Sequence, residues 1–172
     1  MTSEEKRRAQ YKKLIADIKD DLISIRKIAG DINQIILVLK NEKDQVRAAD
    51  LMACAGYLHH YYTGIESILE RISRSFDGGL VLSGDYHREL LRSMTLEIPD
   101  IRPSVISKEL AEELDEYRRF RHMFRHAYGS ELRWRKLEPL ANGIDSLTEN
   151  LQEKLSLFVR FVDKLSDSIS LK

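Results

Sequence analysis

The apolar residues of this chain follow helical spacing almost everywhere, and this spacing limits the fold to an all-helical one. The first series, in steps of three and four, is Tyr11, Ile15, Ile18, Leu22, Ile25, Ala29, Ile32, Ile36 and Leu39. Residues spaced in this way lie on one face of an α-helix, whereas a half-buried strand needs strict alternation. We therefore expect one long helix over residues 3–40, with Gly30 as a weak point inside it.

A second apolar series has the same spacing and begins soon after the first one ends. Its members are Leu51, Ala55, Leu58, Tyr62, Ile65, Leu69, Ile72 and Phe76. Because only the short polar sequence NEKD separates the two series, we expect an antiparallel hairpin of long helices. The run Asp77-Gly78-Gly79 is expected to end the second helix, since glycine readily adopts the backbone conformation found just after helix ends.

Three further helices are expected in the second half of the chain. A short one has Asp85 as its N-cap and extends to about Met94, and the next begins after Ser107, whose hydroxyl can cap it. The last begins near Pro139, a residue suited to a first helical turn. Its apolar series is Leu140, Ile144, Leu147, Leu151, Leu155, Phe158, Val162, Leu165 and Ile169. The predicted fold is an all-α antiparallel bundle of four main helices plus a short one.

The composition is that of a soluble globular protein. The 172 residues, 42% hydrophobic and 33% charged, suffice for a single domain over residues 1–172. The helix within residues 1–42 is expected in the bundle or in a dimer interface. No apolar run approaches the ~20 residues needed to cross a bilayer, and the polar N-terminus lacks a signal segment. The single cysteine, Cys54, fits a reducing cytoplasm, and its apolar surroundings predict a buried residue rather than a nucleophile.

Residues 117–128, YRRFRHMFRHAY, concentrate basic and aromatic side chains in a chain whose formal net charge is +0. The positive charges of residues 117–136 are Arg118, Arg119, Arg121, Arg125, Arg133, Arg135 and Lys136, and the only acid there is Glu131. Like charges three or four residues apart repel by a few tenths of a kcal/mol, roughly. Arginine also suits forked hydrogen bonding to phosphate oxygens. The stretch is either a solvated basic helix face or a binding site for an anion.

Two histidines narrow the chemistry of this stretch. His122 and His126 are four residues apart and share a helix face, but a zinc site needs a third ligand, which only folding could bring from His59, His60 or His87. We therefore expect no metal or other cofactor. Imidazole can instead transfer protons near neutral pH, while an arginine stabilises charge on a phosphate. Those are the requirements of metal-free RNA cleavage by the adjacent 2′-hydroxyl.

The spacing of Arg121 and His126 raises a geometric difficulty. Residues five apart are separated by about 140° around a regular helix, so both side chains cannot point directly at one spot. Either the long arginine side chain curls round, or the helix is distorted, or two copies of the segment face each other.

The segment Arg121 to Tyr128, RHMFRHAY, resembles the hallmark of the HEPN superfamily: an arginine, a polar residue, three variable residues and a histidine. The tyrosine two residues further on extends this to R-x4-H-x-Y, a form similar to that of HepT toxins and their relatives. The segments GDYHRELLRSM and YYTGIESILERI also resemble parts of HepT-like ribonuclease domains. The resemblance covers about residues 45 to 165, and it implies a HEPN-type helical bundle.

The resemblance also implies an activity. HEPN proteins are commonly homodimers whose arginine–histidine motifs meet across the interface, and many are metal-independent endoribonucleases. On this basis Arg121 is expected to bind the phosphate and transition state, and His126 to be the general acid/base. His122 occupies the polar motif position, and with Arg125 and Arg118 it is expected to bind the RNA substrate.

A partner and a modification follow from the same resemblance. HepT toxins are paired with a small nucleotidyltransferase antitoxin of the MNT type, which silences the toxin by attaching AMP to the motif tyrosine, here Tyr128. Glu66 is an auxiliary candidate that could orient His126 or pair with an arginine, or form only a structural ion pair. His87 is expected to pack between helices and bond a backbone carbonyl. Trp134 could stack on a base or pack against the bundle.

Two other classes of function stay open. The protein could be a non-catalytic helical module that binds a nucleotide, an RNA or a protein partner through the same basic patch. It could also be a purely structural dimer built on the two long hairpin helices.

Overall fold

Six α-helices make up the fold in the computed structural model, which describes residues 1–41, 46–79, 84–126 and 132–169. The helices are α1 (Ser3–Asn41), α2 (Ala48–Phe76), α3 (Tyr86–Met94), α4 (Lys108–His126), α5 (Trp134–Asn142) and α6 (Ile144–Ser168). The described ranges contain no β-strand beyond one isolated bridge between Ile98 and Arg102. The predicted all-α class is confirmed. Within these ranges no helix has both the length and the apolar character to cross a membrane.

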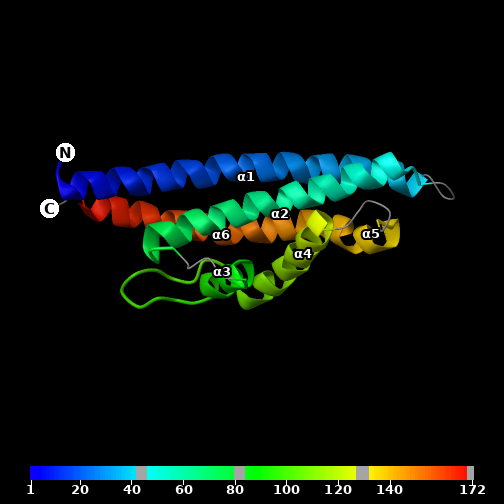
Figure 1. Ribbon diagram of the computed structural model, residues 1–172. Helices are drawn as coiled ribbons and strands as arrows, with labels where there is room; N and C mark the ends of the chain where they lie inside the picture. The colour runs from blue at the N-terminus through cyan, green and yellow to red at the C-terminus, as the bar shows by residue number, and fades with distance from the viewer. Residues whose placement is uncertain (42–45, 80–83, 127–131, 170–172) are drawn as a thin grey trace.

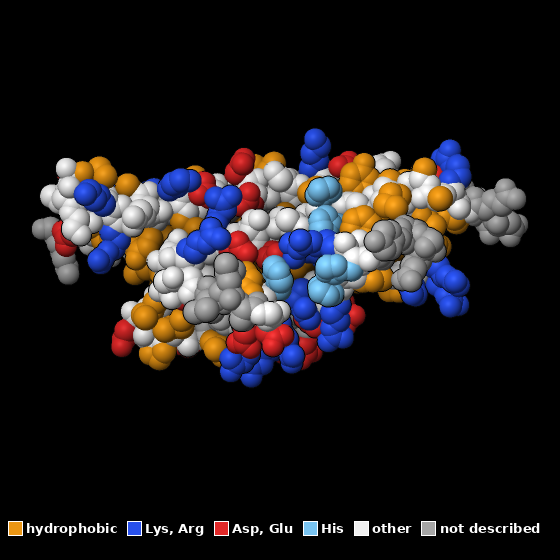
Figure 2. Space-filling model, in the orientation of Figure 1, with side chains coloured by type: hydrophobic (Ala, Val, Ile, Leu, Met, Phe, Trp, Pro, Cys, Tyr) orange, Lys and Arg blue, Asp and Glu red, His pale blue; other side chains and the backbone are white. Residues whose placement is uncertain are grey.

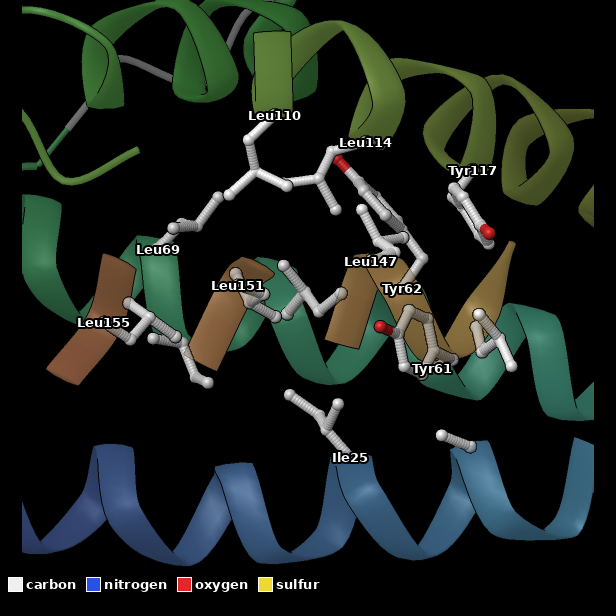
Figure 3. Packing of buried hydrophobic residues seen from close by; sticks show 14 of the residues in the cluster. Ile25, Tyr61, Tyr62, Leu69, Leu110, Leu114, Tyr117, Leu147, Leu151 and Leu155 are labelled. Atoms are coloured by element: carbon white, nitrogen blue, oxygen red, sulfur yellow. The ribbon is translucent and has the colours of Figure 1, made fainter. Parts of the chain in front are cut away.

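The three long helices lie side by side, and α3 and α4 pack against one side of them. Helices α2 and α6 lie between α1 and α4 (Figures 1 and 3). The start of α1 and the end of α6 meet at one end of the molecule, where the Lys12 ammonium lies 2.7 Å from Asp163 and 3.4 Å from Asp167. Helices α3 and α4 flank the side of α2 away from α1 (Figure 1). This arrangement places the basic end of α4 over the middle of α2.

The predicted apolar faces form the core. Ile18, Ile25 and Ile32 of α1 are at most 1% exposed, because the three- and four-residue steps place them on one face toward α2 and α6. Figure 3 shows Ile25 of α1 opposite Tyr61 and Tyr62 of α2, with leucines of α4 and α6 completing the cluster. Local periodicity therefore decides which face of each long helix is buried.

The last predicted helix is wrong in one respect: it is divided into α5 and α6 at Gly143 rather than beginning near Pro139. Pro139 lies inside α5. The Tyr117 hydroxyl of α4 donates a hydrogen bond of 2.6 Å to the carbonyl oxygen of Leu140, which an unbroken helix would use for the amide of residue 144. A β-carbon at Gly143 would lie 3.4 Å from this hydroxyl and 3.4 Å from the Pro139 carbonyl oxygen. The division of the helix at Gly143 thus coincides with the hydrogen bond from Tyr117 of α4.

The other predicted helix boundaries agree with the structure. Helix α2 ends at Phe76, and Gly78 and Gly79 have φ angles of 74° and 82°, which favour glycine. Ser107 caps α4, since its Oγ accepts a hydrogen bond of 3.2 Å from the amide of Leu110. Asp85 holds the N-cap position of α3, but its side chain makes no capping hydrogen bond. The predicted NEKD link lies largely outside the described residues.

Cys54 is fully buried in α2, as predicted, and this burial raises the pKa of its thiol to about 11. At neutral pH the native thiol is therefore both inaccessible and protonated, and only the thiolate is a good nucleophile. We expect Ellman's reagent to leave Cys54 unmodified in the folded protein and to react fully in guanidinium chloride. Fast, complete reaction under native conditions would contradict the burial of Cys54.

Candidate functional site

Glu66, in the middle of α2, is the polar centre at which three helices meet. Its side chain is only 5% exposed. One carboxylate oxygen lies 3.0 Å from Nη1 of Arg121 on α4, and the other lies 2.6 Å from Nδ1 of His87 on α3. A buried carboxylate is costly unless it is paired and hydrogen-bonded. Of the roles predicted for Glu66, the structure shows the pairing with an arginine and shows no contact with His126 among the described residues.

Arg121 is held by α2 rather than free in solvent. Its side chain is 13% exposed, and besides the ion pair to Glu66 its Nε donates a hydrogen bond of 3.2 Å to the Thr63 hydroxyl. Thr63 and Glu66 are three residues apart and so lie on the same face of α2, where both contact one guanidinium. The Nη2 group makes no hydrogen bond to any described residue. Arg121 is thus positioned by α2, and its Nη2 has no partner within the described part of the chain.

His122 and His126 lie together on the last turn of α4 and are exposed. Their ring centroids are 4.7 Å apart, as expected for helix positions four apart. Neither ring, nor the exposed Arg125 guanidinium, forms a hydrogen bond or ion pair with the part of the chain that the structure describes. Arg121 turns inward to Glu66, so one chain does not bring Arg121 into contact with His126. The 140° separation expected on a regular helix therefore remains.

The charge repulsion expected in the basic stretch is compensated by an acid just before it. Asp115 accepts hydrogen bonds from Nε of Arg118, at 2.6 Å, and from Nε of Arg119, at 2.7 Å. Burial disfavours the ionised Asp115 carboxyl, but the hydrogen bonds and charges of the two arginines outweigh burial and lower its pKa below the usual value. The sequence prediction missed this because it counted acids only from residue 117 onward. The substrate-binding role of Arg118 stays a prediction, and its guanidinium is already paired with Asp115.

His59 extends the site along α2. Its ring lies 5.5 Å from the ring of Phe124, and its Nδ1 is buried without a partner in the described structure. Burial lowers its pKa, as do the charges of Arg121, His60 and Arg125, and both effects favour the neutral imidazole. Figure 2 shows histidine side chains gathered near the middle of one face, beside Lys and Arg side chains.

The prediction for His87 was wrong in its bonding partner, because its Nδ1 contacts the Glu66 carboxylate and not a backbone carbonyl. The two residues are 21 positions apart on different helices, so no spacing rule connects them. One indication of this pair is present in the sequence: a histidine near the start of a short helix, and an acid on an otherwise apolar helix face that would need a polar partner. Glu66 links the two, because it also pairs with Arg121 of α4.

Of the remaining residues singled out in the sequence, some lie in the bundle and others lie in segments that the structure does not describe. Trp134 is partly buried and packs against the core, which agrees with the packing alternative for this residue. Tyr128 and Glu131 lie outside the described residues. No group of three or more His, Cys, Asp and Glu side chains within those residues is arranged to hold a metal ion.

The comparison with family models places this geometry in a known group. A model described as HepT-like protein matches residues 53–162, which extend from α2 into α6 and include Glu66, His87, Arg121 and His126. Most of α2 and all of α3, α4 and α5 lie within the match, and α1 lies outside it. No curated protein and no solved structure matches the chain. Because the family match covers more than half of the chain, the protein belongs to the HepT-like family of the HEPN superfamily.

Proposed function

We propose that this protein is a metal-independent endoribonuclease whose site contains Arg121 and His126. The observation that carries the proposal is the Arg121 guanidinium, held by Glu66 and Thr63 in a HepT-like chain, with exposed histidines on the next turns of the same helix. Members of the HEPN superfamily are usually ribonucleases. A fixed guanidinium and a titratable imidazole are the groups that cleavage through the 2′-hydroxyl requires.

In this proposal Arg121 offers Nη2, which no described residue bonds, to a non-bridging phosphate oxygen. Because its other nitrogens are already bonded to α2, the group loses little freedom on binding, and its charge faces the oxygen that becomes more negative in the transition state. The 2′-oxygen attacks phosphorus, the bond to the 5′-oxygen breaks, and the products are a 2′,3′-cyclic phosphate and a 5′-hydroxyl. His126 transfers a proton in this step, while His122, Arg125 and Arg118 contact the substrate.

A homodimer is part of the proposal. Arg121 points toward α2 and His126 is exposed, so the two side chains of one chain do not converge. Two copies facing each other along the ends of α4 would bring the histidine of one chain to the arginine of the other.

The direct test is cleavage of single-stranded RNA by purified protein. We expect Arg121→Ala and His126→Ala each to lower the cleavage rate by about 100-fold or more, because each removes a transition-state interaction. The exposed Arg135→Ala change removes the same charge outside the site and should change the rate less than about three-fold. EDTA should leave the rate unchanged. Equal cleavage by the wild type and both site variants would refute the assignment, and RNA binding without turnover would favour the non-catalytic module.

The toxin role makes a separate prediction. We propose that an MNT-type nucleotidyltransferase is the antitoxin and that it silences the ribonuclease by attaching AMP to the Tyr128 hydroxyl, two residues after the proposed acid/base. Co-expression with such an enzyme encoded beside this chain should add the mass of one or more AMP units, measured on the intact protein. Tyr128→Phe removes the acceptor oxygen and should prevent the addition. An unmodified Tyr128 beside an active antitoxin would contradict this mechanism.

A further inference from the structure

We propose that His87 is the general base of this site, held by Glu66 in the tautomer that presents a free Nε2. The inference rests on the proposed ribonuclease function and deepens it, because it names a second proton-transfer residue on a different helix.

The tautomer follows from the hydrogen bond. The Nδ1 atom of His87 lies 2.6 Å from a Glu66 carboxylate oxygen, and an ionised carboxylate only accepts hydrogen bonds. The proton of the neutral imidazole is therefore on Nδ1, which leaves Nε2 with a lone pair. No described residue bonds Nε2, and the His87 side chain is 39% exposed. Part of the imidazole is therefore open to solvent.

A purely structural role explains the Glu66–His87 pair less well than a catalytic role does. Arg121 already compensates the charge of Glu66 at 3.0 Å, and their side chains are only 13% and 5% exposed. His87 is the exposed member of the group, so it adds little buried contact but places a base at the surface. A carboxylate that orients an imidazole and stabilises its protonated form is the arrangement that activates histidine bases in enzymes.

Several charged and titratable groups surround His87. Glu66 faces the imidazole directly, Arg121 acts through that carboxylate, and the ring of Tyr86 lies edge-on at 5.4 Å. The charges of Glu70 and Arg74 act on Tyr86 from the next turns of α2. Because the same carboxylate contacts both Arg121 and His87, a phosphate held by Arg121 lies close to the proposed base.

The proton balance of the step is complete. Nε2 of His87 takes the proton of the 2′-hydroxyl while the 2′-oxygen forms its bond to phosphorus. The bond to the 5′-oxygen breaks, and His126 donates the proton which that oxygen needs. The imidazolium of His87 remains paired with Glu66 until it loses the proton to water. Neither an oxidant nor a metal ion is required.

The test uses the full-length protein and a labelled RNA oligonucleotide with one cleavable linkage. His87→Asn is the matched variant, because its amide can still donate a hydrogen bond to Glu66 but cannot take a proton. We expect it to lower kcat by about 100-fold with KM changed less than three-fold, and to remove the acidic limb of the pH–rate profile. His60→Ala, on the exposed surface of α2, is the control and should leave kcat and the profile unchanged.

A sulfur-substituted linkage separates the base from the acid. When the leaving 5′-oxygen is replaced by sulfur, the leaving group needs no proton, so loss of the general acid is tolerated and loss of the base is not. This substrate should restore cleavage by His126→Ala but not by His87→Asn. Restored cleavage by His87→Asn, or a wild-type kcat and pH profile in that variant, would overturn the inference and leave the proposed function intact. Absence of cleavage by the wild type, with Arg121→Ala also without effect, would overturn the proposed function itself.

Discussion

Replacing Glu66 by alanine is expected to lower the free energy of unfolding by about 3–5 kcal/mol. The change removes the carboxylate that pairs with Arg121, and among the described residues it leaves this largely buried guanidinium, 13% exposed, with the Thr63 hydroxyl as its remaining partner. A buried charge without its counterion is far more costly than a missing pair. Urea or guanidinium denaturation, followed by circular dichroism, measures the loss.

The chain offers a matched control one turn further along α2. Glu70 pairs with Arg74 at 3.2 Å, but the Arg74 side chain is 70% exposed. Glu70→Ala should therefore cost no more than about 1 kcal/mol, because water replaces the lost partner. Glu66→Gln, which retains the shape and loses the charge, should lie between the two. Similar losses for Glu66→Ala and Glu70→Ala would show that the Glu66 carboxylate is not buried as described.

Replacing Arg102 by alanine should destabilise the fold by a similar amount, about 3–5 kcal/mol. The Arg102 side chain is 0% exposed, and its Nε and Nη2 donate forked hydrogen bonds of 2.7 Å each to the Asp77 carboxylate. Other guanidinium hydrogens reach the carbonyl oxygens of Ser93, Leu96 and Pro103. Removing the donors leaves the Asp77 carboxylate without its arginine and takes a hydrogen bond from the Leu96 and Pro103 carbonyls, and such losses cost free energy where the groups are buried. The Ser93 carbonyl still accepts a hydrogen bond from the Leu96 amide.

Two variants separate the fork of Arg102 from its charge. Arg102→Lys keeps the charge but cannot form the forked pair, so it should recover only part of the lost stability. Arg92→Ala breaks an exposed pair with Glu89 at 3.4 Å and should change the unfolding free energy by no more than about 1 kcal/mol. An equally small loss of unfolding free energy for Arg102→Ala and Arg92→Ala would contradict the burial and hydrogen bonding of Arg102.

The effect of Arg102 extends to the candidate site. The residue joins Asp77, just after α2, to carbonyl oxygens at and beyond the end of α3. Helix α3 carries His87, so the position of this imidazole relative to Glu66 depends on that connection. We expect Arg102→Lys to reduce RNA cleavage more than its loss of stability alone explains, because a displaced α3 moves His87 away from Glu66.

Much of the fold was predictable from local pattern. The apolar residues of α1, α2 and α6 recur every three or four positions, and this periodicity alone places them on one buried face. Gly78 and Gly79 mark the end of α2, and Ser107 marks the start of α4, through conformations that involve only neighbouring residues. The R-x4-H spacing likewise pointed to the end of α4 as the region of interest.

Two of the misses share a physical cause, which is a contact between residues far apart in the sequence. Gly143 divides the last helix next to a Leu140 carbonyl that Tyr117 of another helix contacts, and no local pattern contains that contact. Arg102 was not singled out because its partner Asp77 is 25 residues away. The pairing of Asp115 with two arginines has another cause, because it is local: Asp115 lies two residues before the basic stretch that begins at Tyr117.

The sequence by itself determined the helices, their buried faces and the family, because these depend on residue types at short, regular spacing. Only the tertiary structure decided that Glu66 of α2, His87 of α3 and Arg121 of α4 meet at one buried carboxylate. Which helices lie against one another depends on the packing of whole apolar faces. The polar contacts between those helices follow from that packing, so no spacing along a single helix contains them.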